Sequence, residues 1–408
     1  MLDKRIQEAV RILWMSAEYK RGTEAKALLE EVAAEGNGDA YFFLARCVAG
    51  PAYVAAPFGL KEDDNKCDEY LNKSIELGSA VGMFGARRFG GYEPKGGSYL
   101  HAPYQSDTQV WDAVLGLAQE GDAFIQYMVA NAYYYGDCIE LMGIDMNRMS
   151  DEEGYRSVMK WMDEAEKWYE KSIESGCVQA IGNYVNMLTS GEYGRSKNPS
   201  KALRMKELGA EAGVTKYLVE MGIHYASSDE LKAVSYLEEA LNKGDKEAYY
   251  GLGMVYGISG KNPDLSRSNS YFKEGLKYGA RVTGCKNRLG ENYFYGGHGI
   301  EADKAKAFSY LADLEAENNW GSPMRGMCYL RGWGVAQNYE KARQQLEIYS
   351  GDKMNAIALG EIYAYGLGVP VNINKAMVFW DKFPDEPEVI EHKKNFKKGL
   401  FGWKRIKK

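Results

Sequence analysis

A glycine-rich turn with a histidine inside it is the part of the sequence that most resembles a catalytic loop. The stretch YFYGGHGI contains Gly296, Gly297, His298 and Gly299 in succession. Turns of this composition can aim backbone N–H groups at a phosphate or at an oxyanion. The stretch is therefore either an active-site loop or a corner between two helices, and the neighbouring sequence decides between them.

Later stretches of the chain repeat the plan of this turn with other residues in place of the histidine. The sequences YLRGWGV and YAYGLGV place Trp333 and Leu367 where His298 stands. Chemistry that depended on an imidazole would be lost in both copies. We therefore interpret residues 296–299 as a helix-to-helix corner, in which glycine supplies the positive φ angles of a tight turn.

No other stretch predicts a catalytic, metal or cofactor site. The four histidines, at positions 101, 224, 298 and 392, lie far apart in the sequence, and the six cysteines show no C-x-x-C pair and no metal-ligand spacing. The segment SGKNPDLS (259–266) fails the phosphate-loop pattern, and DMNRMSDEE (145–153) fails the calcium-loop pattern. We expect no catalytic residues, no metal and no cofactor, and therefore a protein that is not an enzyme.

The composition favours a mostly helical chain with a large core. Of its 408 residues, 45% are hydrophobic and only 10 are proline. The formal net charge of −6 argues against a general nucleic-acid binder. Asp3, Lys4 and Arg5 make the N-terminus unlike a signal peptide, and no stretch approaches the roughly 20 apolar residues of a membrane span. We expect a cytoplasmic protein with reduced cysteines that is a monomer or a weak homo-oligomer.

A repeated pair of helices accounts for most of the sequence. In the C-terminal half, a small residue, a tyrosine three positions later and a glycine three positions after that recur with a period of about 36 residues. Each copy continues with Gly-Val or Gly-Ile, a polar turn, Lys-Ala and an apolar row, which indicates a helix A followed by a helix B. A glycine inside helix A is tolerable where another helix crosses closely. The small or apolar position of helix A falls at Ala45, Gly85, Ala130, Val185, Gly222, Gly253, Gly290, Gly326 and Gly360.

This pattern closely resembles the Sel-one-like repeat (SLR) family, which is related to the tetratricopeptide repeats. The best matches to its Leu-Gly-x-x-Tyr-x-x-Gly motif are Leu289, Gly290, Tyr293 and Gly296, and then Leu359, Gly360, Tyr363 and Gly366. The resemblance implies an all-α fold, an α/α right-handed superhelix (solenoid) of about nine helix-pair repeats. It divides the chain into an N-terminal capping helix (1–22), degenerate repeats with insertions (23–213), regular repeats (214–383) and a basic C-terminal helix or tail (384–408).

Two segments fall outside the repeat. The insertion EPKGGSYLHAPYQSD (93–107) contains two tyrosines and a histidine, and it is either a binding loop or a plain surface loop. The tail KKNFKKGLFGWKRIKK (393–408) has eight basic residues and no acidic one. We expect its aromatic and leucine side chains to pack on the last repeat. Contact of the tail with an acidic partner or an anionic membrane is the alternative that the sequence favours less.

The resemblance also implies which residues face a partner. In tetratricopeptide-type repeats, the positions three before, one after and four after the small residue of helix A line a groove. Arginine, asparagine and tyrosine at such positions form directional contacts. Carried over by position, the predicted partner-binding residues are Phe42, Arg46, Tyr127, Asn131, Tyr134, Asn186, Asn287, Glu291, Phe294 and Glu361.

The sequence therefore predicts a non-enzymatic scaffold that clamps a protein partner on a curved helical-repeat surface. The most specific form of this hypothesis is a bacterial toxin-neutralising (immunity) or inhibitor protein. The alternative is a housekeeping adaptor or regulator that is recruited to a membrane-proximal complex through its basic tail. An enzyme is the remaining alternative, and turnover in a broad hydrolase screen would reveal it.

Overall fold

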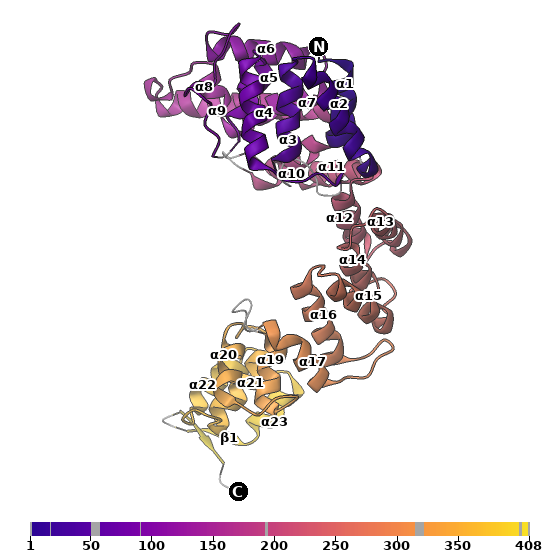
Figure 1. Cartoon of the computed structure of the whole chain (residues 1–408). Helices are drawn as coiled ribbons and strands as arrows, with labels where there is room; N and C mark the ends of the chain where they lie inside the picture. Colours follow the sequence, from indigo (N-terminus) through magenta and orange to yellow (C-terminus); the bar gives the residue numbers. More distant parts are fainter. Residues whose placement is uncertain are drawn as a thin grey trace. The chain divides into compact units, whose positions relative to one another are not determined.

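The fold was analysed in a computed structural model, which describes residues 2–16, 18–49, 58–89, 91–191, 195–314, 322–399 and 402–406. The chain divides into two compact units, Met1–Met221 and Gly222–Lys408 (Figure 1).

In the residues that the structure describes, every regular element of the first unit is a helix. Its N-terminal helix α1 (Lys4–Val10) continues into one π-helical turn, Arg11–Met15, before α2 begins. The other helices are α2 (Gly22–Ala34), α3 (Gly38–Val48), α4 (Asp64–Glu76), α5 (Ala80–Ala86), α6 (Asp107–Gln119), α7 (Ala123–Tyr135), α8 (Cys138–Leu141), α9 (Asp151–Glu174), α10 (Gln179–Ser190) and α11 (Pro199–Glu211). Helix α12 (Thr215–Tyr225) spans the boundary between the units.

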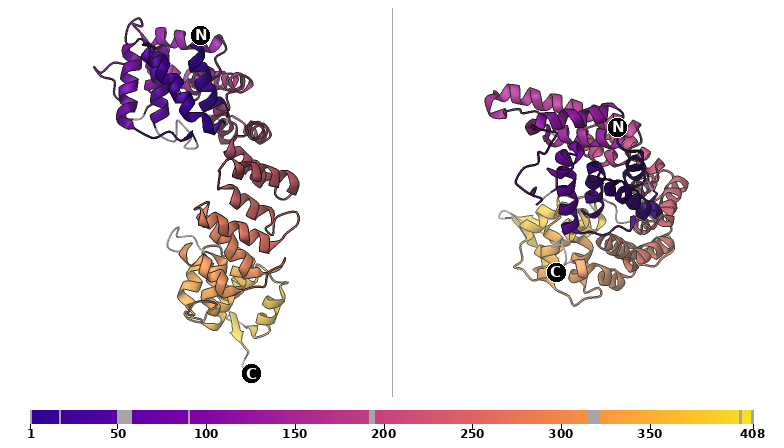
Figure 2. Two further views of the ribbon diagram at one scale, coloured as in Figure 1. Left: turned by 45° about the vertical axis from the view of Figure 1, so that its right-hand side comes forward. Right: turned by 45° about the horizontal axis from the view of Figure 1, so that its top comes forward.

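The second unit continues the series of helices and ends in a small hairpin. Its helices are α13 (Glu230–Asn242), α14 (Ala248–Val255), α15 (Leu265–Lys277), α16 (Val282–Tyr295), α17 (Lys304–Leu311), α19 (Pro323–Arg331), α20 (Tyr339–Glu347), α21 (Lys353–Tyr365), α22 (Ile373–Trp380) and α23 (Pro387–Lys393). Strands β1 (Phe396–Gly399) and β2 (Gly402–Arg405) pair antiparallel. The left view of Figure 2 shows the helices of this unit in successive layers.

The expected repeat of A and B helices is confirmed. Within the described residues, nine consecutive pairs follow the sequence pattern, and each is an A helix followed by its B helix. The pairs are α3/α4, α5/α6, α7/α9, α10/α11, α12/α13, α14/α15, α16/α17, α19/α20 and α21/α22. The chain is thus an all-α solenoid.

The glycines of helix A lie where helix B crosses, as expected. A Cβ atom on Gly290 would stand 2.6 Å from the Leu311 side chain, and one on Gly253 would stand 2.4 Å from the ring of Phe272. The same atom on Gly360 would meet Trp380 Nε1 at 2.1 Å. Because no Cβ fits at these distances, the small residue sets how closely the two helices of a pair approach.

The Lys-Ala motif and the repeated tyrosine have a shared structural role. Asp303 begins α17 by accepting a hydrogen bond from the backbone N–H of Lys306, and the Lys306 ammonium then lies 4.2 Å from the centre of the Tyr293 ring. Tyr293 in turn stacks on Tyr310, with ring planes 3° apart. The same arrangement recurs in the last pair, where Lys375 lies 3.9 Å from the Tyr363 ring. In the Asp/Asn-x-x-Lys-Ala motif, the Asp or Asn therefore caps helix B, and the lysine ammonium packs on the tyrosine ring of helix A.

Residues 296–299 form the corner between α16 and α17, as interpreted from the sequence. The Gly297 N–H donates to the Ile300 carbonyl at 2.9 Å, and the Ile300 N–H donates back at 3.2 Å, which closes a tight turn. His298 adopts a φ of 46° there. Trp333 and Leu367 are not among the described residues with positive φ, because their corners are one residue shorter. The three positions are therefore not equivalent in backbone conformation, which corrects the alignment made from the sequence.

The C-terminal segment 384–408, expected as a basic helix or tail, contains the helix α23 and, as a feature that was not expected, a hairpin. After α23 it forms the β1–β2 hairpin, in which Phe396 pairs with Arg405 and Lys398 with Trp403. Gly399 and Gly402 pair with each other at one end of the two strands. Phe396 packs on Trp380 with ring centres 5.9 Å apart, and Trp403 contacts the same core, so the expected packing on the last repeat is confirmed for these two residues. Leu400 and Phe401 lie outside the described residues.

Candidate functional site

Four successive A helices of the first unit line one hollow of about 290 Å³. Helices α3, α7 and α10 each contribute two or more residues to its wall, and α5 contributes Gly85, with Arg88 following two residues after the end of that helix. The lining residues are Phe42, Arg46, Gly85, Arg88, Tyr127, Met128, Asn131, Tyr135, Gln179 and Asn183. We call this hollow the A-helix pocket.

Aromatic rings hold Arg46 at the pocket. Its side chain is buried, with only 8% of the residue exposed. The guanidinium carbon lies 4.9 Å from the centre of the Phe124 ring and 5.4 Å from that of Trp14, both within cation–π range. Since Trp14 belongs to the π-helical turn, the N-terminal segment helps to fix this charge in place.

Two amides of the pocket wall and one phenol behind it form a second fixed group. The Asn131 Oδ1 atom accepts hydrogen bonds from the Tyr169 hydroxyl at 2.7 Å and from Asn183 Nδ2 at 2.8 Å. Burial raises the pKa of the Tyr169 hydroxyl well above its ordinary value, so this hydroxyl stays protonated and remains a donor. These bonds orient the Asn131 side chain before any partner arrives.

The open side of the A-helix pocket carries a second guanidinium. Arg88 is paired with Asp137, and its guanidinium carbon lies 4.8 Å from the centre of the Tyr135 ring. Tyr135 is 54% exposed, so this ring is available for contact at the rim. Among the described residues that line the pocket none is acidic, and the pocket therefore favours an anionic group.

The structure brings four of the predicted partner-binding residues together. Phe42, Arg46, Tyr127 and Asn131 all line the A-helix pocket. The remaining two predicted residues of this unit lie elsewhere. Tyr134 is buried between Tyr135 and Tyr169, and Asn186 is exposed outside the pocket.

The predicted residues of the second unit do not share a pocket of comparable size. Asn287 is exposed, and Glu291 is paired with Arg288 at 2.7 Å beside a hollow of about 10 Å³, which is room for about one water molecule. Phe294 is buried next to Trp333. Glu361 accepts two hydrogen bonds from Arg331, at 2.7 and 2.6 Å.

Several pocket residues were missed in the sequence. Asn183 and Gln179 lie one and two helical turns before Asn186 on α10, so they share about the same face of this helix as the predicted residue but stand nearer its N-terminus. Arg88 and Tyr135 lie three and five positions after the small residue of helix A, and the carried-over rule does not include these positions. A search for basic and aromatic residues within each motif could have found them.

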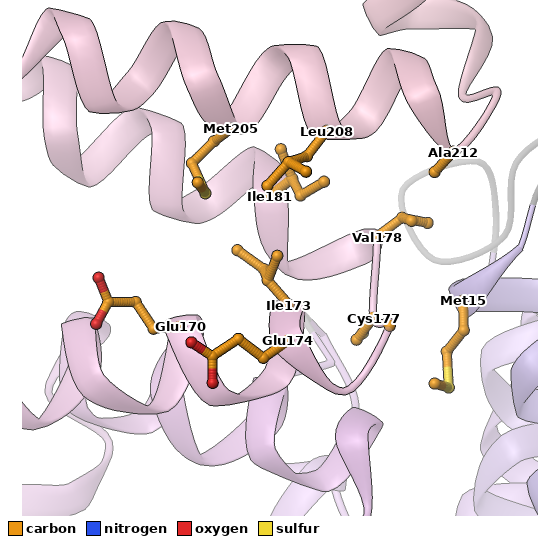
Figure 3. A pocket seen from close by; sticks show the side chains of 11 residues that line it. Met15, Glu170, Ile173, Glu174, Cys177, Val178, Ile181, Met205, Leu208 and Ala212 are labelled. Carbon is orange, nitrogen blue, oxygen red and sulfur yellow. The ribbon is translucent and has the colours of Figure 1, made fainter.

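A second hollow of the first unit has a different character. It measures about 720 Å³ and lies between α9 and α11, with α10 at its back (Figure 3). Its lining is mainly apolar, with two glutamates on one side. The lining residues are Met15, Glu170, Ile173, Glu174, Gly176, Cys177, Val178, Ile181, Met205, Leu208 and Ala212.

The insertion at 93–107 rests on the outside of the first unit. The Tyr99 hydroxyl donates to the Tyr92 carbonyl at 3.2 Å, and the Lys95 N–H donates to Asn72 Oδ1 on α4 at 2.9 Å. Arg87 lies over the Tyr99 ring at 4.8 Å. None of the residues that line the A-helix pocket belongs to the insertion.

The cysteines have the properties of buried core residues. All six are free thiols without solvent exposure of note. Burial raises the pKa of Cys47, Cys67 and Cys138 to about 12, and those of Cys177, Cys285 and Cys328 to about 11, so thiolates are scarce at neutral pH. In the described part of the chain, no group of three or more histidine, cysteine or acidic residues is placed to hold a metal ion.

None of the helices in the described ranges combines the length and the hydropathy that a membrane crossing needs.

Comparisons with known proteins point to one repeat family. Seven segments, which together span about half of the chain, match the family model described as Sel1 repeat: residues 146–177, 186–214, 207–245, 246–275, 285–312, 314–344 and 356–382. No curated protein matches the chain.

Two solved structures are similar to the chain. The first is a protective antigen present in uropathogenic Escherichia coli strains that displays an SLR fold; it has a TM-score of 0.54 and 18% identity, and the match covers 92% of this chain and 75% of the antigen. The second is a Sel1 repeat protein from Oxalobacter formigenes, with a TM-score of 0.44, 20% identity and coverage of 90% and 88%. At such identities the likeness to the antigen shows the fold alone.

Proposed function

The chain belongs to the Sel1 repeat family, and from this premise we propose that it is a protein-binding scaffold whose A-helix pocket holds an acidic segment of a protein partner. Proteins built from Sel1 repeats are in general scaffolds for protein–protein interaction, and their fold is typically non-catalytic.

The observation that carries the proposal is the composition of the A-helix pocket. Two guanidinium groups, two phenols and three side-chain amides converge there without an acidic lining residue among those described. Guanidinium groups bind carboxylates through paired, charge-assisted hydrogen bonds. Arg46 and Asn131 are already held by neighbouring side chains, so a partner would lose little free energy in ordering them.

The more specific role that we propose is that of an inhibitor or toxin-neutralising (immunity) protein. A recess that is already formed suits the capture of an acidic loop on a folded target, because neither partner has to rearrange much. To inhibit a target, the scaffold only has to cover the active or binding surface of that target. The scaffold itself then needs no catalytic group.

The C-terminal hairpin favours a second role, that of an adaptor in a membrane-proximal complex. Lys397 and Lys404 stand opposite each other in the hairpin register and are exposed. Opposed like charges destabilise a hairpin slightly, and an anionic surface would relieve this repulsion.

A charge substitution inside the A-helix pocket tests the proposal. Gln179 is half-buried in the pocket wall and is the first residue of α10, where a glutamate is compatible with the helix dipole. Full-length wild type and Gln179→Glu would be used to capture partners from the native host, followed by mass spectrometry. The matched control is Asn186→Asp, which adds the same charge on the same helix but outside the pocket.

We expect a partner that wild type and Asn186→Asp retain, and that Gln179→Glu binds at least about fivefold more weakly. A partner that Gln179→Glu binds like wild type would refute the pocket as its site. Adding the protein to a purified partner then separates the two roles: an inhibitor abolishes the partner's activity, whereas an adaptor leaves it intact and loses membrane-associated partners when Lys397 and Lys404 are replaced by serine.

A further inference from the structure

The hollow between α9 and α11 is an elongated groove with two straight walls. Along α11 the lining residues Met205, Leu208 and Ala212 recur at i, i+3 and i+7, which is one stripe of a helix. Along the opposite wall Glu170, Ile173 and Glu174 recur at i, i+3 and i+4, and Cys177 follows at i+7. The stripe on α11 covers about 10 Å, or two helical turns, whereas on the opposite wall α9 ends at Glu174 and Cys177 lies in the turn that follows. Figure 3 shows the two rows facing each other across open space.

The floor of this groove is apolar and adaptable. Ile181 is almost fully buried, with 1% exposed, and Val178, Met205 and Leu208 are half-buried. Met15, from the π-helical turn, closes one end. Methionine side chains at two places in the lining let the surface adjust to different apolar side chains.

The charge of the groove is acidic and lies on one wall. Both carboxylates on the α9 wall, those of Glu170 and Glu174, face the open space (Figure 3). Glu170 is partly neutralised by Lys201, at 2.6 Å, whereas Glu174 is exposed and makes no ion pair with the residues that the structure describes. None of the described residues that line the groove is basic.

We propose that this groove is a second docking surface, which takes a cationic amphipathic helix of a protein partner. A helix of about two turns fits between the two stripes, with its apolar face on the floor. Its lysine or arginine residues then lie along the α9 wall, next to Glu174. A compact apolar ligand would fill the volume without using either the length of the stripes or the charge of the wall.

This site goes beyond the proposed function, because its lining and that of the A-helix pocket have no residue in common. The two sites also favour ligands of opposite charge. Failure of one proposal would therefore leave the other unaffected.

Peptide binding to the full-length chain tests the docking surface. The probes are three fluorescent 14-residue peptides: a Leu/Lys sequence with leucine at i, i+3, i+4 and i+7, a scrambled sequence of the same composition, and a version with glutamate in place of lysine. Fluorescence anisotropy at physiological salt measures the affinity. We expect the cationic amphipathic peptide to bind, and the scrambled and acidic peptides to bind at least about tenfold more weakly.

Two variants locate the binding and one serves as control. Glu174→Lys should weaken the cationic peptide about threefold to fivefold, as expected for an exposed ion pair. Ala212→Phe, which places a ring in the groove at an exposed position, should weaken it more than about tenfold. Glu69→Lys on α4 makes the same charge change at an exposed residue that has no ion pair with described residues, and it should leave the affinity unchanged.

Any of four results would overturn the proposal. These are no binding of the cationic peptide, equal binding of the scrambled or acidic peptide, full affinity in Ala212→Phe, and equal losses in Glu174→Lys and Glu69→Lys. Circular dichroism melting curves of each variant show whether the fold is retained, and the peptide comparison on wild type stands even if one variant is unstable.

Discussion

His298 occupies a backbone conformation that most side chains avoid. Its φ of 46° lies in the left-handed region, next to Gly297 and Gly299, which also have positive φ. Histidine, asparagine and aspartate tolerate this region better than β-branched residues do. Backbone geometry therefore accounts for the presence of a histidine in this corner.

Substitutions of His298 should follow backbone preference rather than ring chemistry. We expect His298→Asn to unfold at nearly the same urea concentration as wild type. His298→Val should lose roughly 1–2 kcal/mol of unfolding free energy, because a β-branched residue is strained at positive φ. Equal stability of the two variants would contradict the turn geometry.

Gly360 tests the close crossing of the two helices of a pair. A Cβ there would stand 2.1 Å from Trp380 Nε1, and this indole also donates to the Ile357 carbonyl at 3.1 Å. We expect Gly360→Val to lose about 1–3 kcal/mol through overpacking. Gly116→Ala on α6 is the control, since nothing lies within 4 Å of the added Cβ. It should be stabilising by about 0.5–1 kcal/mol in thermal denaturation.

At the scale of the elements, the lysine of the repeat motif has two structural roles, as Lys306 shows in α16/α17. Its backbone N–H is held by the Asp or Asn that begins helix B, and its ammonium covers the tyrosine of helix A. This double use explains why lysine, tyrosine and the N-cap residue recur together in the sequence. The excess of tyrosine is therefore largely a consequence of the repeat.

Lys306 provides a direct measure of this contact. Burial tends to raise the pKa of the Tyr293 hydroxyl, but the ammonium groups of Lys306 and Lys273 outweigh it, and the pKa lies below its ordinary value. Lys306→Met keeps the length of the side chain and removes the charge, and it should lose about 0.5–1 kcal/mol of unfolding free energy. Lys261→Met, at an exposed lysine of the turn between α14 and α15, should change nothing. Similar losses in both variants would point to net charge instead.

The pairs of helices in the C-terminal half were predictable from the sequence because a glycine, a tyrosine and, in most of them, a lysine recur there at fixed spacing. The hairpin was not, since Phe396 and Trp403 fit both an amphipathic helix and a strand, and the choice depends on packing against Trp380. The A-helix pocket was predicted in part. Arg46 and Asn131 follow the repeat, whereas Asn183 depends on where along α10 the neighbouring helices reach it. The groove next to Glu174 reflects incomplete packing between α9 and α11, which no residue pattern encodes.

At the scale of the whole chain, a repeat array has to cover its two ends. At the N-terminal end, Trp14 is buried against Phe43 and Phe124, with ring centres 5.7 and 5.2 Å away. At the C-terminal end, α23 and the hairpin cover Trp380, on which His392 stacks with ring planes 5° apart. Each end is thus closed by a segment that does not follow the repeat.

Removing the C-terminal cover should destabilise the last pair of helices. We expect deletion of 394–408 to lower the melting temperature by several degrees, because Phe396 no longer covers Trp380, and to increase binding of an apolar dye. The double variant Lys397→Ser/Lys404→Ser, which removes the opposed charges but keeps the aromatic residues, should melt at or slightly above the wild-type temperature. An unchanged melting temperature after the deletion would show that the hairpin is not a cap.

The six buried thiols can report local unfolding at six places in the chain. They are distributed over α3, α4, α8, the α9–α10 turn, α16 and α19. While its repeat is folded, each thiol is buried and protonated. An alkylating reagent can therefore modify it only when that repeat unfolds locally. Mass spectrometry of partly alkylated protein would therefore give six local opening rates from one sample without any introduced label. Their order along the chain would reveal whether opening starts at the capped ends or within the array.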